Sequence, residues 1–135
     1  MESRRYHHTA PITMFYALHQ GLTLVEAEGL EQRLERHQQA HEQVVRGMEQ
    51  MGLEMYVAEQ NRIWNINTPK VPAGVDDLKV RGYLLEKWGI EIAGGFGPLA
   101  GKIFRIGIMG PLATEKNVEM FLGRFDEALR ANGYK

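Results

Sequence analysis

The run over residues 12 to 28 restricts the fold most, because it reads as a helix that is apolar on much of its circumference. Pro11 suits the first helical position, Thr9 or Ala10 is the expected cap, and Thr9 has the better capping chemistry. Gly29 is the expected break. The apolar positions are Ile12, Met14, Phe15, Tyr16, Ala17, Leu18, Leu22, Leu24 and Val25. Such a helix is deeply buried or covered by other protein, so we expect a second copy or a missing domain to cover it.

Residues 30 to 51 predict a second, longer helix with one apolar stripe. Steps of three and four residues alternate along the stripe, and the other faces carry Glu, Gln and Arg. An amphipathic helix packed on one side fits this short pattern better than a coiled coil. Gly52 is a plausible stop. The stripe consists of Leu30, Leu34, His37, His41, Val44, Met48 and Met51.

The rest of the chain predicts short strands and two further helices. Strands are expected near residues 53–58, 62–67, 90–93 and 102–109, and Gly- and Pro-rich loops at 69–74 and 94–101. Asp76 and Thr114 are the expected caps of helices that end near Gly89 and Gly133. This order predicts an α+β fold: a small, mostly antiparallel sheet covered by helices, preceded by a long helical segment. We expect a single domain over residues 1–135, with the N-terminal motif and two helices in 1–52 and the α+β part in 53–135.

Composition excludes several classes of protein. The 135 residues carry 16 Lys and Arg against 17 Asp and Glu, so the net charge of −1 argues against nucleic-acid binding through bulk positive charge. No apolar run approaches the roughly 18 residues of a membrane span. The first eight residues are polar, which predicts no secretory signal. Cysteine is absent, which removes disulfides and thiolate sites. We therefore expect a cytoplasmic protein without a membrane or nucleic-acid partner.

The segment from Arg4 to Pro11 is the first candidate site. It places two cations, two imidazoles, a phenol and a hydroxyl before a helix N-terminus, where unpaired N–H groups favour an anion such as phosphate. The alternative is a basic tail in which Thr9 only caps the helix. Both interpretations stay open on the residues alone.

Arg105 is the second candidate. Strand alternation puts it on one face with Ile103, Gly107 and Met109. An arginine in the middle of an apolar strand is costly unless it is paired or hydrogen-bonded. Its guanidinium suits bidentate binding of a carboxylate. A structural salt bridge with an Asp or Glu explains it equally well.

Two other patterns predict no site. His37 and His41 are spaced for one metal ion, but Gln38 replaces the Glu of the His-Glu-x-x-His pattern and no third ligand is evident, so we expect no metal. Residues 95–100 form a Gly-x-Gly-x-x-Ala, but a strand is expected after them where a dinucleotide fold requires a helix. The glycines there are expected to let the backbone approach something closely.

Several motifs together resemble a known family. They are Tyr6-His7-His8-Thr9-Ala10-Pro11, Glu28-Gly29-Leu30-Glu31, Ile90-Glu91-Ile92-Ala93-Gly94-Gly95, Gly97-Pro98-Leu99-Ala100-Gly101-Lys102, Arg105-Ile106-Gly107-Ile108-Met109-Gly110 and Asn117-Val118. In this order and at these intervals they are similar to the C-terminal part of class V aminotransferases of the alanine–glyoxylate and serine–glyoxylate type. Those are pyridoxal phosphate enzymes of fold type I. The resemblance covers essentially the whole chain.

The resemblance implies roles for three residues. In the family, the Tyr and Thr of the Tyr-His-His-Thr segment reach the cofactor phosphate of the neighbouring subunit, which implies Tyr6 and Thr9 as cofactor-binding residues in a homo-oligomer. The Arg of the Arg-Ile-Gly motif binds the substrate carboxylate, which implies Arg105. The glycine-rich segment 94–101 would lie near the active-site entrance.

One departure limits the implied activity. The family lysine that binds the cofactor covalently lies far upstream of the Tyr-His-His-Thr segment, and only five residues precede Tyr6 here. None of the lysines present matches that position: Lys70, Lys79, Lys87, Lys102, Lys116 and Lys135. We therefore expect no catalytic residue and no covalently bound pyridoxal phosphate in this chain.

The complete enzyme would transfer an amino group to glyoxylate, and its large domain or N-terminal half would be the partner of this chain. On this interpretation the chain is a C-terminal fragment or the product of a split gene. The alternative is a non-catalytic domain of the same fold that binds a small anion or another protein. The sequence leaves open whether alanine or serine is the amino donor.

Overall fold

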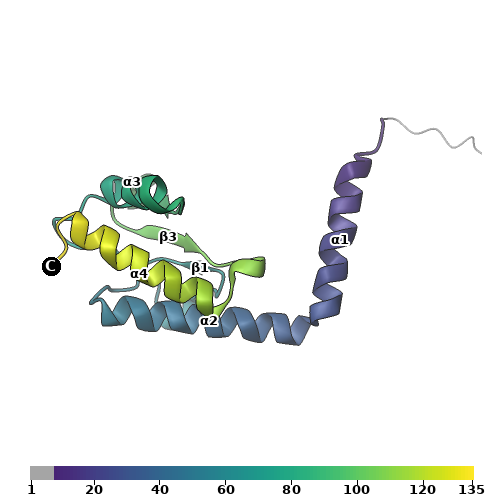
Figure 1. Cartoon of the computed structure of the whole chain (residues 1–135), viewed down its shortest axis with the longest axis horizontal. Coiled ribbons are helices and arrows are strands. Elements are labelled where there is room, and N and C mark those ends of the chain that lie inside the picture. Colours follow the sequence, from purple (N-terminus) through teal and green to yellow (C-terminus); the bar gives the residue numbers. More distant parts are fainter. Residues whose placement is uncertain (1–7) are drawn as a thin grey trace, which may run out of the picture. The chain divides into compact units, whose positions relative to one another are not determined.

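The computed structural model describes residues 8 to 135, and Figure 1 shows the arrangement of the helices and strands. The helices are α1 (Ile12–Glu28), α2 (Leu30–Gln50), α3 (Asp77–Trp88) and α4 (Glu115–Ala131). The strands are β1 (Ile66–Asn67), β2 (Ala93–Gly94) and β3 (Phe104–Gly107), and short 3-10 turns lie at Glu59–Asn61, Gly97–Leu99 and Gly110–Leu112. The four helices and the small antiparallel sheet confirm the predicted α+β class.

The chain divides into two compact units, Met1–Leu34 and Glu35–Lys135. The single domain predicted from the sequence, with its parts 1–52 and 53–135, stays a prediction. In the first unit α1 has the predicted bounds, and Gly29 ends it with a φ of 84°. The expected cap is wrong: Pro11 is the N-cap residue, and no side chain caps the helix. Proline has no N–H to leave unpaired, and its ring fixes φ. It therefore fits the N-cap position, just before the first turn, as well as the first helical position that the sequence predicted for it.

The α1 helix buries none of its residues within this chain. Its large apolar side chains are each more than half exposed, namely Ile12, Met14, Phe15, Tyr16, Leu18, Leu22 and Leu24. We therefore still expect that α1 is buried against other protein, either a second copy or a missing domain. No helix among residues 8–135 is long and apolar enough to cross a membrane.

The predicted stripe of α2 is buried only in the second unit, at His41, Val44 and Met48, with Ala40 beside it. Leu30 and Leu34, at the start of the stripe, are exposed. Gly47 marks a close approach to α4, because a Cβ atom at this position would lie 2.4 Å from the Leu122 Cδ1 atom. The two helices can meet this closely only where one of them has no side chain.

The sheet has the order β1-β3-β2, and both pairs are antiparallel. β3 is therefore the central strand and β2 is an edge. The predicted strands are longer than the observed ones. The run 53–58 forms only an isolated bridge between Met55 and Pro69, and 62–67 forms only β1. The 3-10 turn between them and the missing N–H of Pro69 limit the ladder to a few bonds.

The core lies between β3 and the helices. Phe104 and Ile106 of β3 are buried and alternate with exposed Arg105 and Gly107. The ring of Phe104 meets that of Phe125 on α4 edge-on, with 5.2 Å between their centroids. On α4 the side chains of Val118, Phe121, Phe125 and Leu129 are buried. This packing fixes β3 against α4 and leaves its other face outward.

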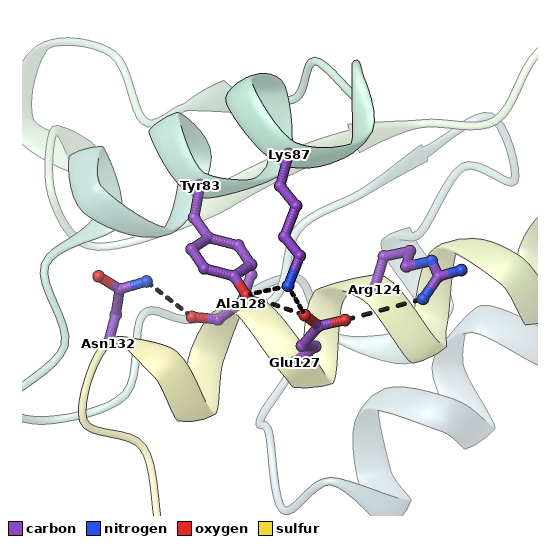
Figure 2. A network of polar contacts seen from close by, with 6 residues as sticks. All are labelled: Tyr83, Lys87, Arg124, Glu127, Ala128 and Asn132. Carbon is purple, nitrogen blue, oxygen red and sulfur yellow. Dashed lines mark hydrogen bonds and ion pairs between the residues drawn. The ribbon is translucent and has the colours of Figure 1, made fainter.

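A polar cluster joins α3 to α4 (Figure 2). The Glu127 carboxylate accepts hydrogen bonds from the Lys87 Nζ at 2.5 Å and from the Tyr83 hydroxyl at 2.8 Å. The Arg124 guanidinium lies 3.5 Å from the centroid of the Trp88 ring, a cation–π contact between the same two helices. The hydrogen bond from Lys87 lowers the pKa of Glu127, and the same bond raises the pKa of Lys87. α3 is thus held to α4 by charge as well as by its buried face.

Candidate functional site

Arg105 lies on the outward face of β3, opposite the core. It pairs across the ladder with Ala93 of the edge strand β2. Its Nε–H donates to the Gly94 carbonyl oxygen at 2.6 Å. The side chain therefore lies over β2, and one of its donors is already committed to the backbone of that strand.

The remaining donors of Arg105 are available for a ligand. Within residues 8–135 no Asp or Glu forms an ion pair with it, so the salt-bridge alternative finds no partner in the described part of the chain. Its terminal nitrogens Nη1 and Nη2 donate no hydrogen bond there either. Two parallel donors on one planar group match the two oxygens of a carboxylate.

Arg105 belongs to the lining of an open hollow of about 560 Å³, which we name the Arg105 hollow. Gly107, two positions along β3, has no side chain, and the Met109 methyl group lies 2.9 Å from where its Cβ atom would be. Arg81 of α3 is a second cation in its wall, and Glu91 is an acid there. The full lining is Arg81, Glu91, Ile92, Ala93, Gly94, Gly95, Arg105 and Gly107.

The glycine-rich segment 94–101 forms one border of this hollow. Gly95 lies directly against the backbone of the same segment, because a Cβ atom there would fall 1.8 Å from the Leu99 carbonyl oxygen. The predicted close approach is therefore made to the segment itself. Phe96 at its tip is 84% exposed. The segment leads into β3, as the sequence predicts, and not into a nucleotide-binding helix.

The far end of β3 is fixed by two residues of α2 that the sequence did not single out for this role. The Arg36 guanidinium donates to the carbonyl oxygens of Gly110 and Ala113 at 2.9 and 2.7 Å. The Gly110 N–H donates to the His37 Nε2 at 3.1 Å. Together they hold the turn that follows the Arg-Ile-Gly segment. No pattern in the sequence pairs positions 73 to 77 residues apart, so only the folded chain reveals these contacts.

The two histidines of α2 have separate partners. His37 bonds to Gly110, whereas the buried His41 lies 2.7 Å, Nδ1 to Oδ1, from Asn67 of β1. His41 is thus part of the core, and His37 is half-buried. In the described part of the chain no group of three or more His, Cys, Asp or Glu side chains could hold a metal ion.

The predicted phosphate site is only partly described. Tyr6 and His7 lie outside the described residues. Thr9 is exposed, and its hydroxyl caps no helix. Thr9 and Arg105 belong to the two different units of the chain.

Comparison with known proteins decides the family. No protein-family model matches the chain. Alanine–glyoxylate aminotransferase of Drosophila melanogaster is 42% identical over 130 residues, which are 96% of this chain and 33% of that protein. The chain corresponds to the C-terminal part of class V glyoxylate aminotransferases. This confirms the family that the motifs of the sequence indicate.

Solved structures of the same family agree. The crystal structure of ureidoglycine–glyoxylate aminotransferase from Bacillus subtilis matches with a TM-score of 0.90 and 40% identity, over 95% of this chain and 34% of that one. Alanine–glyoxylate aminotransferase from Nostoc sp. matches with a TM-score of 0.90 and 38% identity, over 96% of this chain and 34% of that one. The chain spans about a third of the length of the relatives it matches.

Proposed function

We propose that this chain holds the carboxylate of a small amino or oxo acid through Arg105, as one part of an aminotransferase of the glyoxylate type. The observation that carries the proposal is the state of the Arg105 side chain. Its Nε is fixed to the Gly94 carbonyl at 2.6 Å, its terminal nitrogens have no partner among the described residues, and the residue lines the Arg105 hollow. A guanidinium held at one nitrogen presents the others in a defined direction.

The charges of the hollow favour a substrate with a single carboxylate. Arg81 is a second cation, but its Nε–H donates to the Asp77 carboxylate at 3.1 Å. Glu91 adds a negative charge to the same lining. A second carboxylate on the substrate would be repelled by Glu91 and would gain little from Arg81, which is already paired with Asp77. Glyoxylate and alanine, with one carboxylate each, fit this balance.

Pyridoxal phosphate is the cofactor that the family implies for the complete enzyme, and when bound it supplies the electron sink for amino-group transfer. Thr9 fits its phosphate in chemical type, because an exposed hydroxyl can donate a hydrogen bond to a phosphate oxygen. Tyr6 would share this role. Covalent attachment does not fit the Arg105 hollow, because none of the lysines belongs to its lining.

The rest of the enzyme is proposed as the partner. The relatives are about three times as long as this chain, so the cofactor-binding lysine and the large domain would come from the part that the chain does not span. On this proposal these 135 residues alone do not transaminate. Assembly as a homo-oligomer would bring the Thr9 segment to a neighbouring subunit.

Binding of glycolate, an unreactive relative of glyoxylate, tests the role of Arg105 on this chain directly. We expect a dissociation constant of about 1 mM by NMR titration, the strength of a single charge-assisted fork. Arg105→Gln should abolish the shifts around residues 93–95. Lys102→Gln, an exposed lysine three residues away, is the matched control. Equal glycolate shifts in wild type and Arg105→Gln would refute the proposal.

The second candidate function is association with another protein through α1. The observation that favours it is the row of large apolar side chains on this helix, none of them buried within the chain. A chain that used only this surface would bind a partner whether or not Arg105 was intact. Retained association in Arg105→Gln, together with no glycolate binding in wild type, would favour this second function.

A further inference from the structure

Gly94 is the point at which three side chains meet. Arg105 reaches its carbonyl oxygen from the outward face of the sheet, at 2.6 Å. On the side to which a Cβ atom would point, Gly94 faces Asp77 and Arg81 of α3. A Cβ atom there would lie 2.8 Å from the Asp77 Oδ2 and 3.2 Å from the Arg81 Nη2. The backbone of the edge strand is thus enclosed between Arg105 on one side and an ion pair on the other.

The ion pair is itself held in place. Asp77 and Arg81 are one turn apart on α3 and bond at 3.1 Å, and their side chains are 11% and 27% exposed. The other Asp77 oxygen, Oδ1, faces Gly101, whose Cβ atom would lie 3.9 Å away. The carboxylate therefore lies beneath both ends of the glycine-rich segment 94–101. A half-buried pair of this kind has fewer conformations than an exposed pair, and it is less screened by solvent.

We propose that Asp77 and Arg81 are positioning residues for Arg105: they hold the backbone of Gly94 so that its carbonyl retains the Arg105 Nε–H. This inference rests on the proposed function, because the terminal nitrogens of Arg105 are then directed to a substrate carboxylate. Arg81 acts through the backbone of β2 and does not touch the substrate. Its charge is balanced by Asp77, so it repels Arg105 little although both line one hollow.

Solvent exchange of the Arg105 Nε–H, measured by NMR on the full chain without ligand, tests this role. In wild type the Gly94 carbonyl is expected to protect this proton. Arg81→Gln should speed its exchange about 3- to 10-fold, the factor that loss of one ordinary hydrogen bond gives. Glycolate binding should weaken by a similar factor. Lys79→Gln removes the same charge from an exposed position of the same helix, and it should leave both values unchanged.

Arg81→Lys separates geometry from charge. The lysine keeps the positive charge but lacks the planar group that lies against Gly94 and bonds to Asp77 through Nε. We expect it to behave like Arg81→Gln. Wild-type exchange and wild-type glycolate affinity in Arg81→Lys would overturn the positioning role, because they would show that a nearby charge is sufficient.

Gly94→Ala tests the same contact from the backbone side and does not depend on the folding of the Arg81 variants. Its methyl group would press on Asp77 and Arg81, so exchange of the Arg105 Nε–H should again become faster. Unchanged exchange in folded Gly94→Ala would overturn the inference. The two proposals fail separately. A protected Nε–H without glycolate binding in wild type refutes only the proposed function, and glycolate binding with exchange that no Arg81 variant alters refutes only the positioning role.

Discussion

Single glycines set the shape of the surface around Arg105. Gly95 has no room for a side chain, because a Cβ atom would lie 1.8 Å from backbone that cannot rotate away. We expect Gly95→Ala to destabilise the fold by about 1–3 kcal/mol, the usual cost of forcing an atom into a packed site. Gly123 on α4 is exposed with nothing within 4 Å, so Gly123→Ala should stabilise by about 0.5–1 kcal/mol. Urea denaturation measures both, and a lower midpoint in Gly123→Ala or an unchanged one in Gly95→Ala would contradict this account.

At the residue scale, the sequence predicted what a side chain can bind better than which residues that side chain contacts in the fold. The face of Arg105 followed from strand alternation, and its suitability for a carboxylate followed from the guanidinium itself. Its bond to Gly94 did not follow, because that contact depends on which strand lies at the edge of the sheet. Nothing in the sequence assigned a role to Arg81, because an i, i+4 pair with Asp77 is common on helix surfaces. Its role follows only from the fold, in which β2 lies beside this pair. Thr9 and Tyr6 remain predictions of the family resemblance.

At the element scale, helix caps were predictable where a short polar side chain precedes the helix. Thr114 accepts from the Asn117 N–H at 3.3 Å, and Asp76 accepts from the Leu78 N–H at 2.9 Å, as the sequence predicts. Strand lengths were not predictable, because apolar runs such as 53–58 are extended without completing a ladder. A strand needs a neighbour along its whole length, and the partner is set by tertiary contacts.

The caps give a prediction with a matched control. Thr114→Ala removes the hydroxyl that caps α4 and should cost about 1 kcal/mol of folding free energy. Thr9→Ala removes the same hydroxyl before α1, where it caps nothing, and should change stability by less than about 0.5 kcal/mol. Chemical denaturation followed by circular dichroism measures both values. An equal loss in the two variants would mean that Thr9 caps α1 after all.

The cluster between α3 and α4 predicts a pH dependence. The pKa of Glu127 is lowered by its hydrogen bonds from Lys87 and Tyr83, so its stabilisation is present above its ordinary value of 4.5 and is lost as the pH falls through the lowered pKa. The pKa of Lys87 is raised by Glu127, so the contribution of that residue is present below 10.5 and is lost as the pH rises through the raised pKa. The contact is therefore fully formed between these two limits.

Glu127→Gln should therefore lower the melting temperature at pH 7, by a small amount because the pair is solvent-exposed. The difference from wild type should shrink when the pH is taken below the lowered pKa of Glu127. Glu119→Gln, an exposed acid on the same helix with no partner in the described residues, should show no difference at either pH. A Glu127→Gln difference that stayed constant down to acid pH would show that packing, and not charge, joins the helices.

At the scale of the whole molecule, α1 is the element that the chain itself leaves uncovered. Its apolar residues stand on all sides, and such a surface associates with whatever protein covers it. This chain corresponds to about a third of the length of its relatives. In a protein of that length, a large part of the surface of this chain is expected to contact the other two thirds. Without that remainder, a second copy of the chain is the available cover.

Self-association through α1 is therefore expected for the chain on its own. Sedimentation should show species above the monomer mass of 15.4 kDa, and Leu18→Glu with Leu22→Glu should return the chain to that mass, because charges on the helix oppose burial. The double variant Leu78→Glu with Leu85→Glu carries the same charges on exposed leucines of α3 and should remain associated. A wild-type chain that sediments at 15.4 kDa would show that copies of this chain do not cover α1.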